Sequence, residues 1–256
     1  LAKYMNSPDT ELFHKGNVLY NFARARKAQG KDGTIIAVEG YMDAIALSQA
    51  GFGNVVAPLG TALTENQLEL LWRMTGEPVL CFDGDKAGLK AAWRAADLAL
   101  PLVQPGKTVR FALLAEGKDP DDLVRTEGPD AFAKVLGEAR PLVDLIWMRE
   151  TSGGVFDTPE KRADLEKTLR EITSRIRDET VRFHYSQEMR ERVQVFFGSR
   201  RPPRNQGGNF RKDDRQRKGL IAEGRMPVSE SLTRSASVKG GAMPLREATI
   251  IVALIS

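Results

Sequence analysis

The sequence has one cysteine, two histidines and no long hydrophobic run. Cys81 lies inside an apolar stretch and has no second cysteine to pair with, which excludes an internal disulfide. The absence of any Cys-x-x-Cys pair excludes a zinc ribbon in this chain. We therefore expect Cys81 to be a small buried hydrophobic residue in a reducing cytoplasm.

No apolar stretch approaches the roughly 20 residues that a membrane-spanning helix needs, and the first residues lack the pattern of a signal peptide. These absences predict a soluble cytoplasmic protein with no membrane partner. Because the chain starts with Leu1 and ends in an uncapped apolar run, we expect an internal fragment of a longer protein. The net charge of +4 is modest, with acid concentrated in two short motifs and base on either side of them.

Short apolar runs alternate with helical patterns in the first half of the chain. This order predicts an α/β fold with a parallel sheet of about four strands and right-handed crossovers. Nearly all residues of the predicted strands are apolar, as in strands that are covered on both faces. The predicted strands are residues 34–39, 54–59, 78–83 and 108–114, and the predicted helices are residues 42–50, 65–74 and 87–103.

The second half of the chain predicts helices and then a linker. Residues 118–198 form an expected helical subdomain, and within it residues 159–197 have apolar positions spaced roughly like one helix face. Residues 199–242 are rich in Arg, Pro, Gly, Asn and Ser, so they predict a flexible linker. The apolar positions of the expected face are Leu165, Leu169, Ile172, Ile176, Val181 and Phe183.

Acidic residues follow two of the predicted strands. Glu39 comes directly after the first strand, where it could bind a metal or simply complement the dipole of the next helix. Asp83 and Asp85 flank a glycine after another strand, where they could share one cation or form an ordinary turn. Two acidic strand ends in adjacent crossover units can meet at one sheet edge, which is where open α/β sheets bind ligands. Carboxylates there suit Mg²⁺ and phosphoryl transfer.

Two further loops have both a structural and a functional interpretation. Asp119 precedes a proline, so it is a good helix N-cap, and with Asp121 it could also face a second metal ion. Thr64 with Gln67 forms a capping box, which we favour over contact with a phosphate.

The first residues combine an aromatic, an amide and cations. Lys3, Tyr4, Asn6 and Lys15 fit a surface that tracks a single nucleic-acid strand, with bases stacking on the ring and cations facing phosphates. A solvated basic face is the alternative.

Several motifs together resemble the catalytic core of bacterial DNA primases of the DnaG type. They occur in the order of that family over about residues 1–150. The motifs are KYMNSPDT at residues 3–10, LFHKG at 12–16, VEGYMD at 38–43, LGTA at 59–62, CFDGD at 81–85 with AG at 87–88, and GKDPDD at 117–122.

This resemblance implies a Toprim domain, the metal-binding unit that primases share with topoisomerases and some nucleases, at residues 31–117. It implies that residues 1–30 end a basic template-binding subdomain and that residues 243–256 begin a truncated helicase-binding domain. The implied metal ligands are Glu39, Asp83 and Asp85, with Asp43, Asp119 and Asp121 lining the site or serving a second ion. Lys3, Tyr4, Asn6 and Lys15 are implied to guide the template.

The implied function is template-directed synthesis of short RNA primers from ribonucleoside triphosphates on single-stranded DNA. The cofactor would be Mg²⁺, with Mn²⁺ as an alternative, whereas zinc would belong only to an amino-terminal domain absent from this chain. The implied partner is the replicative helicase at the replication fork, and we expect a monomer.

Two other functions stay open at this stage. The carboxylates alone also fit a nuclease or a topoisomerase, although none of the four tyrosines is placed like a topoisomerase nucleophile. A non-catalytic module that binds single-stranded DNA or the helicase is the second alternative. The role of Glu39, as direct metal ligand or as acid-base group, is likewise open.

Overall fold

The computed structural model describes residues 14–29, 33–59 and 62–198. The chain divides into two compact units, residues 1–202 and 203–256, and all described residues belong to the first. The predicted linker and the predicted start of a helicase-binding domain lie outside the described residues, as do Lys3, Tyr4 and Asn6.

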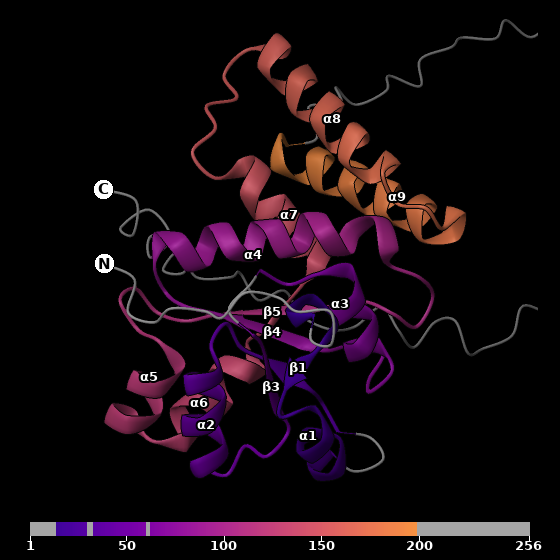
Figure 1. The fold of residues 1–256 in the computed structure, drawn as a ribbon. Helices are drawn as coiled ribbons and strands as arrows, with labels where there is room; N and C mark the ends of the chain where they lie inside the picture. Colours follow the sequence, from indigo (N-terminus) through magenta and orange to yellow (C-terminus); the bar gives the residue numbers. More distant parts are fainter. Residues whose placement is uncertain (1–13, 30–32, 60–61, 199–256) are drawn as a thin grey trace, which may run out of the picture. The chain divides into compact units, whose positions relative to one another are not determined.

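The helices and strands of the described part follow the order expected for a crossover fold (Figure 1). They are η1 (Lys15–Asn17), β1 (Leu19–Tyr20), α1 (Phe22–Gln29), β2 (Ile36–Ala37), α2 (Tyr41–Gln49), β3 (Val55–Pro58), α3 (Glu65–Trp72), β4 (Val79–Phe82), α4 (Lys86–Ala99), η2 (Leu100–Leu102), β5 (Arg110–Leu113), α5 (Pro120–Glu127), α6 (Pro129–Gly137), β6 (Arg140–Pro141), α7 (Leu142–Thr151), α8 (Pro159–Ser174) and α9 (Glu179–Phe196).

The described strands form one mixed sheet in the order β1-β3-β2-β4-β5-β6. The four predicted strands are confirmed as its parallel centre, β3-β2-β4-β5. The strands β1 and β6, which pair antiparallel at the two edges, were not predicted from the sequence. Each has only two residues, too few for an alternating pattern, and Pro141 in β6 is tolerated because an edge strand needs fewer ladder hydrogen bonds.

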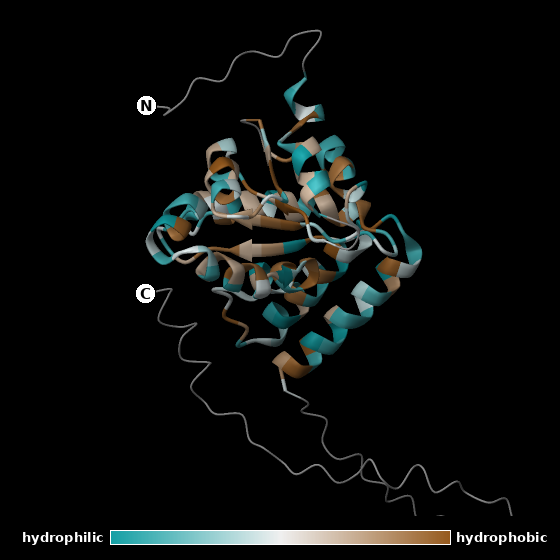
Figure 2. Ribbon diagram, turned by 90° about the horizontal axis from the view of Figure 1, so that it is seen from below, coloured by the Kyte–Doolittle hydropathy of each residue, from teal (hydrophilic) through white to brown (hydrophobic). Residues whose placement is uncertain are grey.

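Alternate residues of the strands pack into two separate cores. Leu80, Phe82 and Phe111 point to the face that packs with α3, α4 and α7. Val79 and Cys81 point to the other face, where α2, α5 and α6 lie. Figure 1 shows α4 and α7 on one side of the sheet and α2, α5 and α6 on the other, and Figure 2 shows strand arrows mainly in hydrophobic colours. The prediction that the strands are covered on both faces and that Cys81 is buried is confirmed.

The chain changes direction across the sheet between β2 and β4. From β2 it crosses through α2 on one face to β3, and then it returns through α3 on the opposite face to β4. The carboxyl ends of β2 and β4 therefore lie side by side at a topological switch point, where open α/β sheets bind ligands.

The charged segment 159–197 forms a helical hairpin of α8 and α9. Asp178 caps the start of α9, because its Oδ1 accepts a hydrogen bond from the Val181 N–H at 2.9 Å. Four predicted apolar positions, Leu165, Leu169, Ile172 and Ile176, are buried. The prediction for Phe183 is wrong: its side chain is 64% exposed, because α9 begins a new helix with its own orientation. The division into a separate helical subdomain stays a prediction, while the core beside α4 extends continuously into α8 and α9.

No helix within the described residues is both long and apolar enough to cross a membrane.

A small ion-pair network joins α4 to the helices that follow the sheet. Asp97 of α4 accepts hydrogen bonds from Arg149 of α7 at 3.0 Å and from Arg175, at the end of α8, at 3.2 Å. Arg149 also contacts Glu150 at 2.6 Å, and its side chain is largely buried. A partly buried pair of this kind is screened less by solvent than an exposed one.

We expect Asp97→Ala to lower the free energy of unfolding by about 1–2 kcal/mol, because it leaves Arg149 partly buried with one acid fewer. Urea unfolding followed by circular dichroism measures the change. The control is Lys161→Ala, which breaks the exposed Lys161–Asp157 pair and should cost less than about 0.5 kcal/mol. Equal losses in the two variants would contradict a special role for the Asp97 network.

Candidate metal centre and active site

Glu39 and Asp83 meet where β2 and β4 end. The Asp83 backbone N–H donates a hydrogen bond to Glu39 Oε1 at 3.3 Å. Because β2 and β4 are parallel neighbours, the residues that follow them leave the sheet at the same edge. The predicted juxtaposition of these two acidic strand ends is confirmed.

The turn that carries Asp83 and Asp85 is fixed by close contacts between backbone segments. A Cβ on Gly84 would lie 1.7 Å from the Ala115 carbonyl oxygen, and a Cβ on Gly88 would lie 2.3 Å from the Asp83 carbonyl oxygen. The Gly84 N–H donates to the Lys118 carbonyl at 2.9 Å, which ties this turn to the loop after β5. Glycine is therefore required at both positions to bring the loops after β4 and β5 together.

Asp85 and Asp119 are helix N-caps. Asp85 Oδ1 accepts from the Gly88 N–H of α4 at 2.6 Å, and Asp119 Oδ1 accepts from the Asp122 N–H of α5 at 2.6 Å. The predicted cap at Asp119 with Pro120 in the first turn is confirmed. In each of these two carboxylates one oxygen accepts the N-cap hydrogen bond, so the second oxygen is available to a ligand.

Asp43 faces the same region from α2. Its Oδ2 accepts from the Gly40 N–H at 3.2 Å, so it stabilises the start of α2. Its electrostatic neighbours include Asp119, Asp121 and Glu39. All six acids named from the sequence therefore act on one another electrostatically, directly or through a shared neighbour.

Burial and mutual repulsion perturb three of these carboxyl groups. Burial, followed by the charges of Glu39 and Asp43, raises the pKa of Asp83 to about 7. Burial and then the charge of Asp119 raise the pKa of Asp43 to about 6. For Glu39, burial raises the pKa, and the hydrogen bond from the Asp83 backbone opposes the shift. The site gathers more negative charge than it neutralises, which is the situation a bound cation relieves.

The donors fit a hard divalent cation of the Mg²⁺ type. Asp83 Oδ1 is buried and accepts no hydrogen bond from the described residues, so it is an orphaned oxygen at the centre of the acids. Within the described ranges no three acidic, histidine or cysteine side chains converge closely enough to hold an ion on their own. Mg²⁺ usually takes one or two carboxylates and completes its shell with water and phosphate oxygens, which matches this arrangement.

The structure places two other predicted positions against α3. Thr64 forms the predicted capping box, since its Oγ1 accepts from the Gln67 N–H at 3.2 Å and its N–H donates to Gln67 Oε1 at 3.1 Å. Lys15 lies in η1 and is only 8% exposed as a residue, and its carbonyl accepts a hydrogen bond from Gln67 Nε2. The predicted contact of Lys15 with nucleic acid stays a prediction.

A pocket of about 530 Å³ lies beside Glu39, between β2, β4 and α4. Arg94 of α4 lines it together with Glu39, and its charge favours the ionised form of that carboxyl. Arg94 was not among the site residues predicted from the sequence. Its signal was available in the four-residue spacing of Lys86, Lys90 and Arg94.

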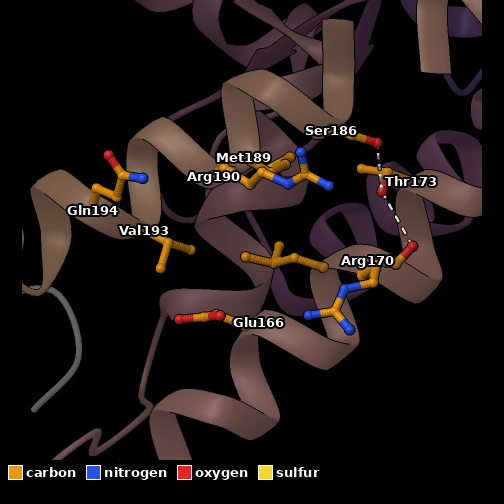
Figure 3. A pocket seen from close by; sticks show the side chains of 9 residues that line it. Glu166, Arg170, Thr173, Ser186, Met189, Arg190, Val193 and Gln194 are labelled. Carbon is orange, nitrogen blue, oxygen red and sulfur yellow. Dashed lines mark hydrogen bonds between the residues drawn. The ribbon is translucent and has the colours of Figure 1, made fainter. Parts of the chain in front are cut away.

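A second groove, of about 370 Å³, lies between α8 and α9 (Figure 3). Ser186 donates to Thr173 Oγ1 at 3.4 Å, and Thr173 donates to the Arg170 carbonyl at 3.1 Å, so hydroxyl groups join the helices at one end. Glu166 and Arg190 flank an apolar floor that includes Val193. The groove presents both charges and apolar surface.

Three family models match the chain. Residues 33–112 match a Toprim domain, residues 1–26 match the N-terminal domain of the DNA primase catalytic core, and residues 147–197 match a DnaB-helicase binding domain of primase. The last match covers part of α7, α8 and α9, whereas the predicted start of a helicase-binding domain lies at residues 243–256.

Curated DNA primases are similar over 193 residues, with 45% identity for Rickettsia felis and 39% for Escherichia coli K12. These alignments cover 75% of this chain but only 32% and 33% of the two relatives.

Solved structures are similar in fold. A DNA primase domain from Pseudomonas aeruginosa has 43% identity and a TM-score of 0.68, with 76% of this chain and 60% of that chain covered. A DnaG primase catalytic domain bound to single-stranded DNA has 39% identity and a TM-score of 0.68, with 74% of this chain and 61% of that chain covered.

The sheet, its switch point and the acidic loops define a Toprim-type catalytic core. The chain belongs to the family of bacterial DnaG-type DNA primases and spans about a third of the length of the curated relatives it matches.

We expect Asp83→Asn to stabilise the metal-free protein at pH 8 by roughly 1–2 kcal/mol, an amount already reduced for solvent screening. The pKa of Asp83 in the folded protein is about 7, above the value of 3.8 for an ordinary aspartate. The folded state therefore loses free energy of unfolding as pH rises from about 4 through about 7, where the folded carboxyl ionises. The advantage of the variant should therefore grow from pH 4 to pH 7 and then level off. Thermal unfolding in EDTA measures it.

Adding Mg²⁺ to the same thermal unfolding experiment tests whether Asp83 is a metal ligand. It should raise the melting temperature of the unsubstituted chain at pH 8 and raise that of Asp83→Asn much less, because binding to the folded state stabilises it by mass action. Asp164→Asn, which changes an exposed acid of α8, is the matched control and should respond to Mg²⁺ like the unsubstituted chain. An identical Mg²⁺ response of Asp83→Asn would exclude Asp83 as a ligand.

Proposed function

We propose that this chain carries the RNA-synthesising centre of a DNA primase, which joins ribonucleotides on a single-stranded DNA template in a metal-dependent nucleotidyl transfer. The observation that carries the proposal is the orphaned, buried Asp83 oxygen among carboxylates at the switch point of β2 and β4. The similarity to DNA primases, one of them bound to single-stranded DNA, supports the choice of reaction and template.

In this proposal Asp83 and the free oxygen of Asp85 hold the divalent ion, with Glu39 beside them. Asp43, Asp119 and Asp121 line the site or serve a second ion. When bound, a divalent ion neutralises charge on the triphosphate and lowers the pKa of the attacking hydroxyl. The protein contributes position and charge, because phosphoryl transfer requires little covalent chemistry from side chains.

The fold supports this work by holding the acids in place before any ligand arrives. The N-cap bonds of Asp85 and Asp119 fix those side chains, and the hydrogen bond between Glu39 and the Asp83 backbone fixes the two strand ends. Such fixed groups lose little freedom on ligand binding, which favours transition-state stabilisation. Glu39 fits either role left open by the sequence, since its raised pKa suits proton transfer and its position suits metal binding.

We expect Asp83→Asn to reduce RNA synthesis by at least about 100-fold, which corresponds to roughly 2.7 kcal/mol of transition-state stabilisation. The full chain is incubated with a single-stranded DNA template, ribonucleoside triphosphates and Mg²⁺, and labelled RNA is resolved by electrophoresis. Asp164→Asn, with its exposed α8 carboxylate, is the control and should keep the activity of the unsubstituted chain.

The same assay separates the alternatives. Loss of template without RNA would favour a nuclease with the same acids. Template binding without synthesis, unchanged by Asp83→Asn, would favour a non-catalytic binding module. Either result would overturn the primase proposal.

We further propose that the α8–α9 hairpin contacts the replicative helicase. The match of residues 147–197 to a helicase-binding domain of primase supports this partner. The hairpin offers the groove between its helices and the exposed apolar side chains of Phe183, Val195 and Phe196. Exposed aromatic and aliphatic groups near charged residues are typical of protein interfaces.

Phe183→Gln should weaken helicase binding by roughly 10-fold, because it removes an exposed aromatic side chain of the kind that anchors interfaces. Biolayer interferometry with the immobilised replicative helicase measures the affinity, and circular dichroism confirms that the helix content is unchanged. Met42→Gln replaces an exposed hydrophobic residue of α2 and is the matched control. Equal affinity of both variants and the unsubstituted chain would remove Phe183 from the interface.

A further inference from the structure

Three cations form a row along the outer face of α4. Lys86, Lys90 and Arg94 are spaced by four residues, so they follow one side of the helix over a length of about 12 Å. All three are exposed. The buried residues of α4, such as Ala92 and Ala96, lie on the opposite side and pack into the core. Figure 1 shows α4 running across the same side of the sheet as α3 and α7.

The row is unfavourable for an isolated helix. Like charges four residues apart repel each other, and Lys86 stands in the first turn, where the helix dipole disfavours a cation. Other helices pair their cations with nearby acids, as Lys167 does with Glu171. Within the described residues none of the three α4 cations makes an ion pair, since Asp97, the one acid of α4, is held by Arg149 and Arg175. Lys86 and Lys90 therefore present positive charge that no acid of the described residues pairs with, and Arg94 adds a third charge beside Glu39.

The row starts at the acidic site. Lys86 directly follows Asp85, and Arg94 lines the pocket that also contains Glu39. Helical side chains lean toward the helix N-terminus, so the long side chains of Lys90 and Arg94 lean toward the carboxylates. A polyanion whose reacting end lies at the acids would find compensating charge along α4. None of the three positions is aromatic, so the contacts would be with phosphates rather than with bases.

We propose that the outer face of α4, formed by Lys86, Lys90 and Arg94, binds the phosphate backbone of the single-stranded template as the strand passes the acidic site. The proposal rests on the proposed primase function and adds a part of the template path that lies on the Toprim-type sheet. The three residues are positioning residues, because they hold the strand and take no part in the bond that forms. Binding through phosphates alone gives no preference among base sequences.

The test measures the affinity of the full chain for a labelled single-stranded oligonucleotide of 20 thymidines by fluorescence anisotropy in EDTA, at several salt concentrations. Each single-strand phosphate neutralised contributes about 0.7 to the slope of log affinity against log salt. The triple variant Lys86→Gln, Lys90→Gln and Arg94→Gln should therefore lower the slope by about 2 and weaken binding by roughly 10-fold or more at low salt. An oligonucleotide of mixed sequence should give the same losses.

The matched control removes the same charge elsewhere. Lys107→Gln, Lys134→Gln and Lys167→Gln change three exposed cations outside α4 and should leave the slope nearly unchanged. Equal losses in both triple variants would show an effect of net charge alone, and no loss in the α4 variant would place the strand elsewhere. Either outcome overturns the proposal.

Measuring both template affinity and RNA synthesis distinguishes a failure of the α4 proposal from a failure of the proposed primase function. In the synthesis assay the single variant Lys90→Gln, which keeps Arg94 beside Glu39, should raise KM for the template and leave kcat nearly unchanged. RNA synthesis by the unsubstituted chain together with unchanged template affinity of the α4 variant would reject the α4 path alone. Selective loss of binding in a chain that makes no RNA would reject the primase function and retain the α4 surface.

Discussion

The parallel pairing of β2 with β4 is the constraint on which the site depends. These strands are 43 residues apart between their first residues, Ile36 and Val79, yet they align in register. The pairing sets Glu39 beside Asp83, and the repulsion between their carboxyl groups opposes folding in the absence of a cation. The two cores on either side of the sheet supply the apolar burial that offsets this repulsion. Function and stability therefore act in opposite directions at one sheet edge, as is common for active sites.

Much of the fold could be predicted from the sequence, because short apolar runs, their alternation with helical patterns, and capping residues are local signals. The four parallel strands, the capping box at Thr64 and the N-cap at Asp119 are confirmed for this reason. The edge strands β1 and β6 could not be predicted, since two residues have no periodicity and their pairing depends on distant partners. Phe183 was misplaced because the orientation of α9 is set by packing against α8.

The candidate site was predictable in its members and only partly in its arrangement. The adjacency of Glu39 and Asp83 follows from crossover topology, which the alternation of strands and helices predicts. At Asp85 one carboxylate oxygen caps α4 and leaves the other for a ligand, and this depends on the rotation of a single side chain. Arg94 was missed because an exposed cation in a helix is usually solvated, and only the pocket brings it near Glu39. The metal ligands and the template contacts of Lys3, Tyr4, Asn6 and Lys15 stay predictions.

Helix α4 has a mechanical consequence for the molecule. Its first residues pack so closely on the Asp83 turn that Gly88 has no room for a side chain, and near its other end Asp97 is held by Arg149 and Arg175. A helix of 14 residues is about 21 Å long and resists compression along its axis. The turn that carries Asp83 and Asp85 and the ends of α7 and α8 are therefore joined through one rigid helix. Helix α4 thus fixes the spacing between the acidic turn at its start and the Asp97 ion pairs near its end.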